Sequence, residues 1–134
     1  MTLLSWHSGR LARVARSSAA AEIQAACDAD DESLYCRLAL SAILFGQFAL
    51  KDYASAAATI PAAHVIDARC VYDALARSES STLGLRDKKS GLEALSLKQS
   101  VSSSRTALRW THSKAMVADV MTKDSPESQA PDFA

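Results

Sequence analysis

The sequence predicts an α/β chain in which short strands alternate with helices. The first observation behind this prediction is that stretches with apolar residues three, four or seven positions apart alternate with short apolar runs. In addition, Asp67 stands where one apolar run ends and a helical stretch begins. Side chains at the carboxyl ends of strands form the ligand sites of α/β sheets. The 134 residues, 49% of them hydrophobic, suffice for the core of one domain.

The first part of the chain predicts two strands and a long helix. The runs 2–6 and 12–15 are apolar and flank Gly9, which is typical of strand, turn and strand. Ser17 and Ser18 can cap a helix that runs from Ala19 to about residue 45 and ends at Gly46. We expect its buried stripe to consist of Ile23, Cys27, Leu34, Leu38 and Phe45. The acidic residues 28–32 should lie mostly in solvent.

The second part predicts a variable connection over 47–61, a strand over 62–66 and a helix over 68–77. Two more helices, over 83–101 and 114–122, should flank a strand at 106–111. The inward residues of the helices should be Val71, Ala74, Leu75, Leu85, Leu92, Leu95, Met116, Val117 and Val120. The polar residues 124–134 predict a disordered tail beyond a domain that covers 1–123.

Composition excludes some classes of protein. The formal net charge is zero, so there is no global attraction to nucleic acid, although local basic patches remain possible. No apolar run reaches the roughly 20 residues of a membrane span, and we expect no membrane partner. The three cysteines lack metal-binding spacing and predict reduced thiols in an intracellular protein, cytoplasmic or nuclear.

Several short motifs resemble one family. Residues 4–8 (LSWHS) and 14–22 (VARSSAAAE) are similar to the opening of the ribonuclease H domain of copia-type retrotransposon polyproteins. Residues 66–75 (IDARCVYDAL) resemble that domain's element of strand, aspartate and helix. Residues 109–110 (RW) and 118–123 (ADVMTK) resemble its closing strand and helix. The order and separations agree over about residues 2–123, although Leu11, Ala20 and Ile23 depart from the usual pattern.

The resemblance implies a ribonuclease H-like fold, a mixed sheet flanked by helices, here lacking the first strand or strands. It also implies an endonuclease of RNA/DNA hybrids, joined in the parent polyprotein to an upstream reverse transcriptase region. The family's first catalytic aspartate precedes the strand that contains Trp6, and these 134 residues do not include it. We therefore expect little hydrolysis by this chain alone.

By resemblance, Glu22, Asp67 and Asp119 are the metal ligands. Hydrolysis by two Mg²⁺ ions requires convergent carboxylates, the hard oxygen ligands that Mg²⁺ prefers. His112 would assist proton transfer or product release. Each residue also has a simpler interpretation. In that case Glu22 would only complement the helix dipole, and Asp67 would only cap a helix. Asp119 would then be a solvated surface residue and His112 an ordinary loop histidine.

Basic residues form two clusters in the sequence that could contact phosphates. The first comprises Arg10, Arg13 and Arg16, and the second comprises Arg86, Lys88 and Lys89. Of these we select Arg13, Arg16, Lys88 and Lys89 as nucleic-acid contacts; a solvated charged surface is the alternative. Three hypotheses follow: a nuclease domain, a non-catalytic nucleic-acid-binding or interaction remnant of the same fold, and an unrelated helical scaffold.

Overall fold

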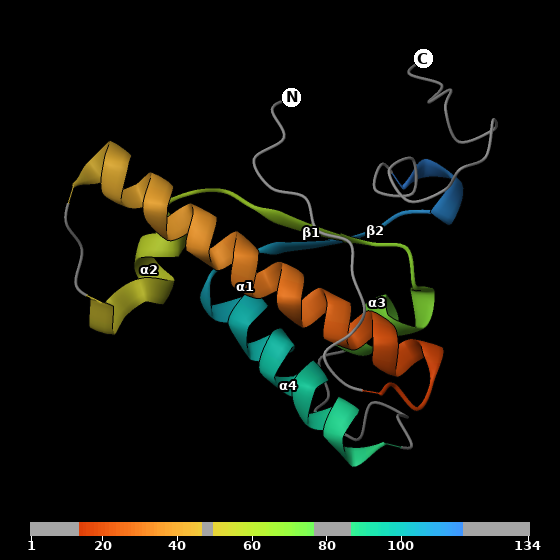
Figure 1. Cartoon of the computed structure of the whole chain (residues 1–134). Coiled ribbons are helices and arrows are strands. Elements are labelled where there is room, and N and C mark those ends of the chain that lie inside the picture. The colour runs from red at the N-terminus through yellow and green to blue at the C-terminus, as the bar shows by residue number, and fades with distance from the viewer. Residues whose placement is uncertain (1–13, 47–49, 77–86, 117–134) are drawn as a thin grey trace.

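The described part of the chain is mostly helical and contains a small parallel sheet. The computed structural model describes residues 14–46, 50–76 and 87–116 (Figure 1). Along these residues the elements are α1 (Ser18–Phe45), the 3-10 turn η1 (Leu50–Asp52), α2 (Tyr53–Ala58), β1 (Ala63–Ile66), α3 (Arg69–Ala76), α4 (Lys88–Ser103), β2 (Ala107–Trp110) and the 3-10 turn η2 (Ser113–Ala115). The predicted α/β class is therefore confirmed at this level.

Helix α1 has the boundaries that its capping residues predict. The Ser17 hydroxyl accepts a hydrogen bond from the Ala20 backbone N–H at 3.1 Å and so satisfies one of the free donors at the helix start. At the other end Gly46 adopts φ +86° and ψ −156°, a conformation open essentially only to glycine. The 28 residues between span about 42 Å, which makes α1 the longest element described.

The two strands pair in parallel, with Ala63 opposite Ala107 and Ile66 opposite Trp110. Side chains alternate across the pair, so His64 and Ile66 are buried under the helices while Val65 is exposed on the opposite face. Parallel strands need a crossover connection, and here α3 and α4 supply it. The carboxyl ends of β1 and β2 consequently lie at one edge of the sheet.

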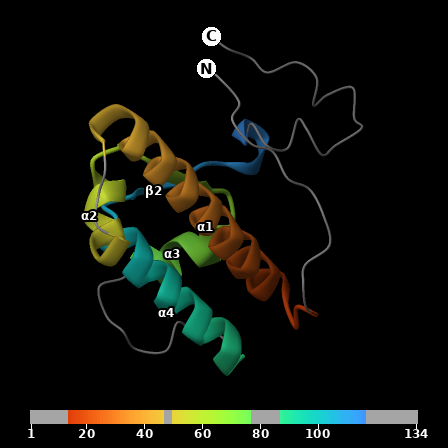
Figure 2. The same cartoon turned by 60° about the vertical axis from the view of Figure 1, so that its left-hand side comes forward.

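The hydrophobic core lies between the helices and the buried face of the sheet. Figures 1 and 2 show α1 and α4 running side by side across this face, with α3 next to both. Helices α1, α3 and α4 and strand β1 each contribute at least one buried side chain to the core: Ile23, Ile66, Val71, Leu75, Ala94 and Leu97. The inward orientation predicted for Val71, Ala74 and Leu75 is confirmed.

Several predicted boundaries differ from the structure. Val14 and Ala15 are not in a strand, and the connection 47–61 includes the short helix α2. A helix from Lys114 was also predicted, but the chain forms the turn η2 and then becomes extended at Met116. The predicted strand 2–6, most of strand 12–15, residues 117–122 of the last helix and the tail 124–134 lie outside the described residues.

Two predicted helix faces were partly wrong. Phe45 is exposed, because the last turn of α1 lies beyond the end of α4 (Figure 1). Leu92 and Leu95 are also exposed. The buried stripe of α4 instead includes Ser90, Ala94 and Leu97, whose spacing is equally helical. Small residues on this stripe allow α4 to approach α1 closely.

None of the described helices combines the length and apolar character needed to cross a membrane.

Candidate functional site

The candidate site lies at the carboxyl edge of the two-stranded sheet. Asp67 directly follows β1, and His112 is the second residue after β2. The Trp110 indole N–H donates a hydrogen bond to the Asp67 backbone carbonyl at 3.1 Å. This bond ties the end of β2 to the turn that presents the Asp67 carboxylate. Parallel pairing therefore brings together two predicted site residues that are 45 positions apart in sequence.

Arg69 and His112 both contact the Trp110 ring. The Arg69 guanidinium carbon lies 4.9 Å from the ring centroid, within the range of a cation–π interaction. The Arg69 Nε also donates to the Asp73 carboxylate at 3.1 Å, four residues along α3. The His112 ring meets Trp110 edge-on, with centroids 6.4 Å apart and planes at 77°. Arg69, Trp110 and His112 thus form a partly exposed cluster beside Asp67, which we call the Trp110 cluster.

The backbone fixes the orientation of His112. Its Nδ1 accepts a hydrogen bond from the Lys114 backbone N–H at 3.2 Å, at the start of η2. A neutral imidazole that accepts at Nδ1 carries its proton on Nε2. The exposed Nε2 can therefore donate to an anion or to a leaving oxygen.

Glu22 lies on the second turn of α1, and its side chain is exposed. The next residue, Ile23, is completely buried and packs in the same core cluster as Ile66 and Val71. The start of α1 is thereby held at the end of the molecule where β1 leads into α3 (Figure 1). Glu22 and Asp67 thus belong to the same end of the fold.

The predicted metal-ligand triad is not assembled within the described ranges. Asp119 lies outside them, and among residues 14–46, 50–76 and 87–116 no three His, Cys, Asp or Glu side chains are grouped closely enough to hold a metal ion. The Mg²⁺ site therefore stays a prediction. Its residues would supply the carboxylate oxygens that this ion prefers.

Three of the four predicted nucleic-acid residues lie at one end of the helical layer, and Arg13 is outside the described residues. Lys88 and Lys89 open α4 and are exposed. Arg16, just before α1, is also exposed and lies near enough to Asp87 to lower the pKa of that carboxyl. The larger cause of the lowered Asp87 pKa is a hydrogen bond from the Ser90 hydroxyl, at 2.9 Å. The described members of the two clusters, Arg16 on one side and Lys88 and Lys89 on the other, therefore lie around the start of α4.

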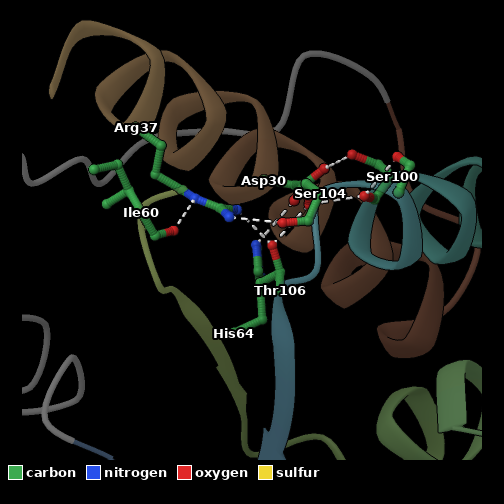
Figure 3. Close-up of polar contacts among 8 residues, drawn as sticks. Asp30, Arg37, Ile60, His64, Ser100, Ser104 and Thr106 are labelled. Atoms are coloured by element: carbon green, nitrogen blue, oxygen red, sulfur yellow. Dashed lines mark hydrogen bonds and ion pairs between the residues drawn. The ribbon is translucent and has the colours of Figure 1, made fainter. Parts of the chain in front are cut away.

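A buried polar network lies apart from the candidate site and joins α1 to both strands (Figure 3). The Arg37 guanidinium donates to the Ile60 carbonyl at 2.9 Å, and to the Thr106 hydroxyl and the Ser104 carbonyl at 2.7 Å each. Burial lowers the pKa of Arg37, and the negative charge of Asp30 opposes that shift. Arg37 therefore ties α1 to the segments that lead into β1 and β2.

Asp30 occupies the other half of this network. One carboxylate oxygen accepts from His64 Nε2 at 3.1 Å, and the other accepts from the Ser100 hydroxyl. The prediction that residues 28–32 lie mostly in solvent was wrong for Asp30, which is buried. Because the carboxylate lies between the histidine and the serine, the serine hydroxyl is not bonded to the imidazole. These contacts hold the helices on the sheet and do not resemble a nucleophile with its base.

The thiol of Cys27 is not a reactive group. Burial, followed by the negative charge of Glu93 and nearby aspartates, raises the pKa of the Cys27 thiol to about 11. Its sulfur lies 3.8 Å from the Glu93 carbonyl, to which it donates. At neutral pH Cys27 is therefore protonated, whereas a nucleophile or metal ligand needs the thiolate. Cys36 and Cys70 are free thiols as well.

Comparison with known proteins finds no matching family model, no matching curated protein and no matching solved structure.

Sequence reasoning missed Arg69 as part of the site and treated Trp110 only as a strand residue. A signal was available for both. Arg69 lies two residues after the predicted ligand Asp67, and Trp110 lies two residues before His112. Once the strands are taken as parallel neighbours, both side chains must lie near the same edge.

Proposed function

We propose that this chain has a ribonuclease H-like fold and acts on RNA/DNA hybrids, as in copia-type polyproteins. One observation carries the proposal: β1 and β2 are parallel neighbours, so that Asp67 and His112 lie at the same edge of the sheet. The element order agrees with it, because a long helix bearing Glu22 precedes β1, and α3 and α4 connect the strands. The structure describes two parallel strands, and the larger mixed sheet of the ribonuclease H-like fold is proposed.

The proposed chemistry assigns a role to each residue. Glu22, Asp67 and Asp119 would hold Mg²⁺, which when bound activates water and stabilises the leaving oxygen. Trp110 positions Asp67, because its indole N–H donates to the Asp67 backbone carbonyl and not to the carboxylate. His112, with its proton on Nε2, would donate to the departing oxygen. Arg16, Lys88 and Lys89 would contact the phosphates of the hybrid.

The proposed setting follows from this chemistry. An RNA/DNA hybrid formed during reverse transcription implies an intracellular location and a reverse transcriptase region in the parent polyprotein. By resemblance, Glu22, Asp67 and Asp119 are three of the acidic residues that the complete site requires. We therefore expect the chain to bind a hybrid more readily than it cleaves one.

A second candidate is a nucleic-acid-binding remnant without catalysis. The convergence of Arg16, Lys88 and Lys89 favours it, because phosphate binding needs positive charge and no metal centre. The two candidates differ in their dependence on Asp67. The nuclease needs its carboxylate, whereas a phosphate-binding surface does not.

The test measures binding and cleavage separately. The full chain is titrated into a fluorescent RNA/DNA hybrid with Ca²⁺ for binding, and it is incubated with Mg²⁺ for cleavage. We expect the Arg16→Ala/Lys88→Ala/Lys89→Ala variant to weaken binding and to reduce the slope of log K against log salt by about 2 to 3. We expect any cleavage to be lost in Asp67→Asn and kept in Asp52→Asn, an exposed aspartate that makes no capping bond.

Two results would contradict the proposal. Equal affinity for the hybrid and for a DNA duplex of the same sequence would contradict the proposal that the chain recognises RNA/DNA hybrids. Strong cleavage that Asp67→Asn leaves unchanged would remove the assigned active site. Hybrid binding without any cleavage, even with a supplied upstream segment that carries an additional aspartate, would favour the non-catalytic candidate.

A further inference from the structure

The Trp110 cluster has features that the proposed metal chemistry does not use. Trp110 keeps 38% of its surface exposed, although it pairs with the buried Ile66 on the neighbouring strand. The ring is nevertheless fixed, because its Nε1 is bonded to the Asp67 carbonyl.

Arg69 is held in place without being enclosed. Its Nε is bonded to Asp73, and its guanidinium lies against the Trp110 ring. Its side chain is still 63% exposed. A guanidinium that is stacked on an aromatic ring and is open on its outer side offers both a planar surface and a positive charge. Arginine planes and aromatic rings are the two kinds of surface on which proteins stack unpaired bases.

We propose that the Trp110 cluster binds an unpaired nucleotide next to the hybrid, with the base stacked on the Trp110–Arg69 surface and its phosphate near Arg69. This inference rests on the proposed function, since it gives the same site an added specificity. The preferred substrate is then a hybrid with a single-stranded extension or a frayed end. His112 closes one side of the surface through its edge-on contact with the Trp110 ring.

The chemistry favours an unpaired nucleotide over a continuous duplex. Inside a duplex each base is stacked on its neighbours, so its face is covered, and an A-form helix is recognised by its shape and backbone. Only an unpaired or terminal base presents a free face to a protein ring. The positive charge of Arg69 beside the ring suits the attached phosphate. Asp73 holds the Arg69 side chain in place, and the guanidinium stays exposed.

The test compares two hybrids of one sequence, a blunt one and one with a short single-stranded RNA extension. The full chain is titrated into each, labelled at the far end, with Ca²⁺ in place of Mg²⁺. Base stacking on an aromatic side chain gives roughly a tenfold gain in affinity. We therefore expect the extended hybrid to bind roughly tenfold tighter than the blunt one.

The variants separate stacking from positioning. Trp110→Leu removes the ring and should abolish the preference for the extension, while Trp110→Phe loses the bond to Asp67 but should keep most of the preference. Arg69→Gln should reduce the preference, and because Arg69 is exposed this variant decides the matter in case Trp110→Leu does not fold. Arg109→Gln and Tyr35→Leu are the matched controls, an exposed arginine on β2 and an exposed aromatic on α1.

The outcomes distinguish this inference from the proposed function. Equal binding of both hybrids by the wild type overturns the inference and leaves hybrid recognition intact. A preference that survives Arg69→Gln and Trp110→Leu overturns it as well. Binding of single-stranded RNA that depends on Trp110, with no affinity for either duplex part, supports the inference and contradicts the proposed function.

Discussion

Asp30 is a buried carboxylate whose charge is stabilised by its neighbours. Burial by itself raises the pKa of Asp30, but hydrogen bonds from His64 and Ser100 and the positive charge of Arg37 more than offset that effect. The pKa of Asp30 is therefore lower in the folded protein than in the unfolded chain. A carboxyl with a lowered folded pKa contributes stability above its unfolded pKa, about 3.9, and loses it as the pH falls toward the folded pKa.

The prediction at this residue concerns Asp30→Asn. At neutral pH we expect the variant to lose roughly 2 kcal/mol of unfolding free energy, because hydrogen bonds to a charged acceptor become bonds to a neutral one. The difference from the wild type should shrink as the pH falls below about 4, because the wild-type carboxyl is then protonated in the unfolded chain, and it should vanish below the lower folded pKa, where the folded carboxyl is protonated too. Urea unfolding followed by circular dichroism across this range measures it.

The matched control for that experiment is Asp73→Asn. Asp73 forms an exposed pair with Arg69 on α3, and such pairs contribute about 0.3–0.5 kcal/mol. A difference between wild type and Asp30→Asn that stays constant down to pH 3 would show that the Asp30 charge does not stabilise the fold.

At the scale of elements, Gly46 and Gly91 differ in their backbone conformation. Gly46 ends α1 with φ +86°, where a side chain would strain the backbone although no atom lies within 4 Å of the added Cβ. Gly91 lies within α4 at an ordinary φ, and it also has open space around it. Because neither site is crowded, an alanine at Gly46 would be opposed by backbone strain alone, and an alanine at Gly91 by neither strain nor collision.

We expect Gly46→Ala to lower the unfolding free energy by about 1–3 kcal/mol and Gly91→Ala to raise it by about 0.5–1 kcal/mol. The first value reflects strain at the helix end, and the second reflects the better helix propensity of alanine. Thermal and urea unfolding of the two single variants test both signs. A stabilising Gly46→Ala would mean that α1 does not end in this conformation.

The elements also show what the sequence could predict. Capping serines, Gly46 and the apolar spacing identified α1, β1 and α3 to within a residue or two, because these signals are local. The buried stripe of α4 could not be chosen, since its leucines and its small residues both recur at helical spacing. The site was predicted only in part: parallel pairing, a long-range property, was needed to bring Asp67, Trp110 and His112 together.

The polar stripe of α1 is a further case. Asp30 and Arg37 follow Ile23 at intervals of seven, so all three lie on one face of the helix. Charged residues at such positions are more often solvated, and the sequence alone favoured that interpretation for Asp30. Their burial depends on partners from β1, α4 and the start of β2, which no local pattern reveals.

At the scale of the molecule, the network in Figure 3 makes α1 and the sheet one unit. Arg37 bonds the residues just before β1 and β2, while Asp30 bonds β1 through His64 and α4 through Ser100. The strands have four residues each, too few to be stable as a separate pair. Their stability must therefore come from the helices that cover them.

The last prediction tests this cooperativity with Arg37→Met. The substitution removes three hydrogen bonds and takes away the positive charge of Arg37 near the buried Asp30, so we expect a loss of roughly 3–4 kcal/mol of unfolding free energy. Arg109→Met, at an exposed position of β2, should change it by less than about 0.5 kcal/mol. Native-state hydrogen exchange locates the loss. If α1 and the sheet unfold together, the amides of Ile66 and of the middle of α1 lose protection by the same free energy. A loss confined to β1 and β2, with α1 as protected as in the wild type, would show that the strands open independently of the helix and that the buried charges do not couple them.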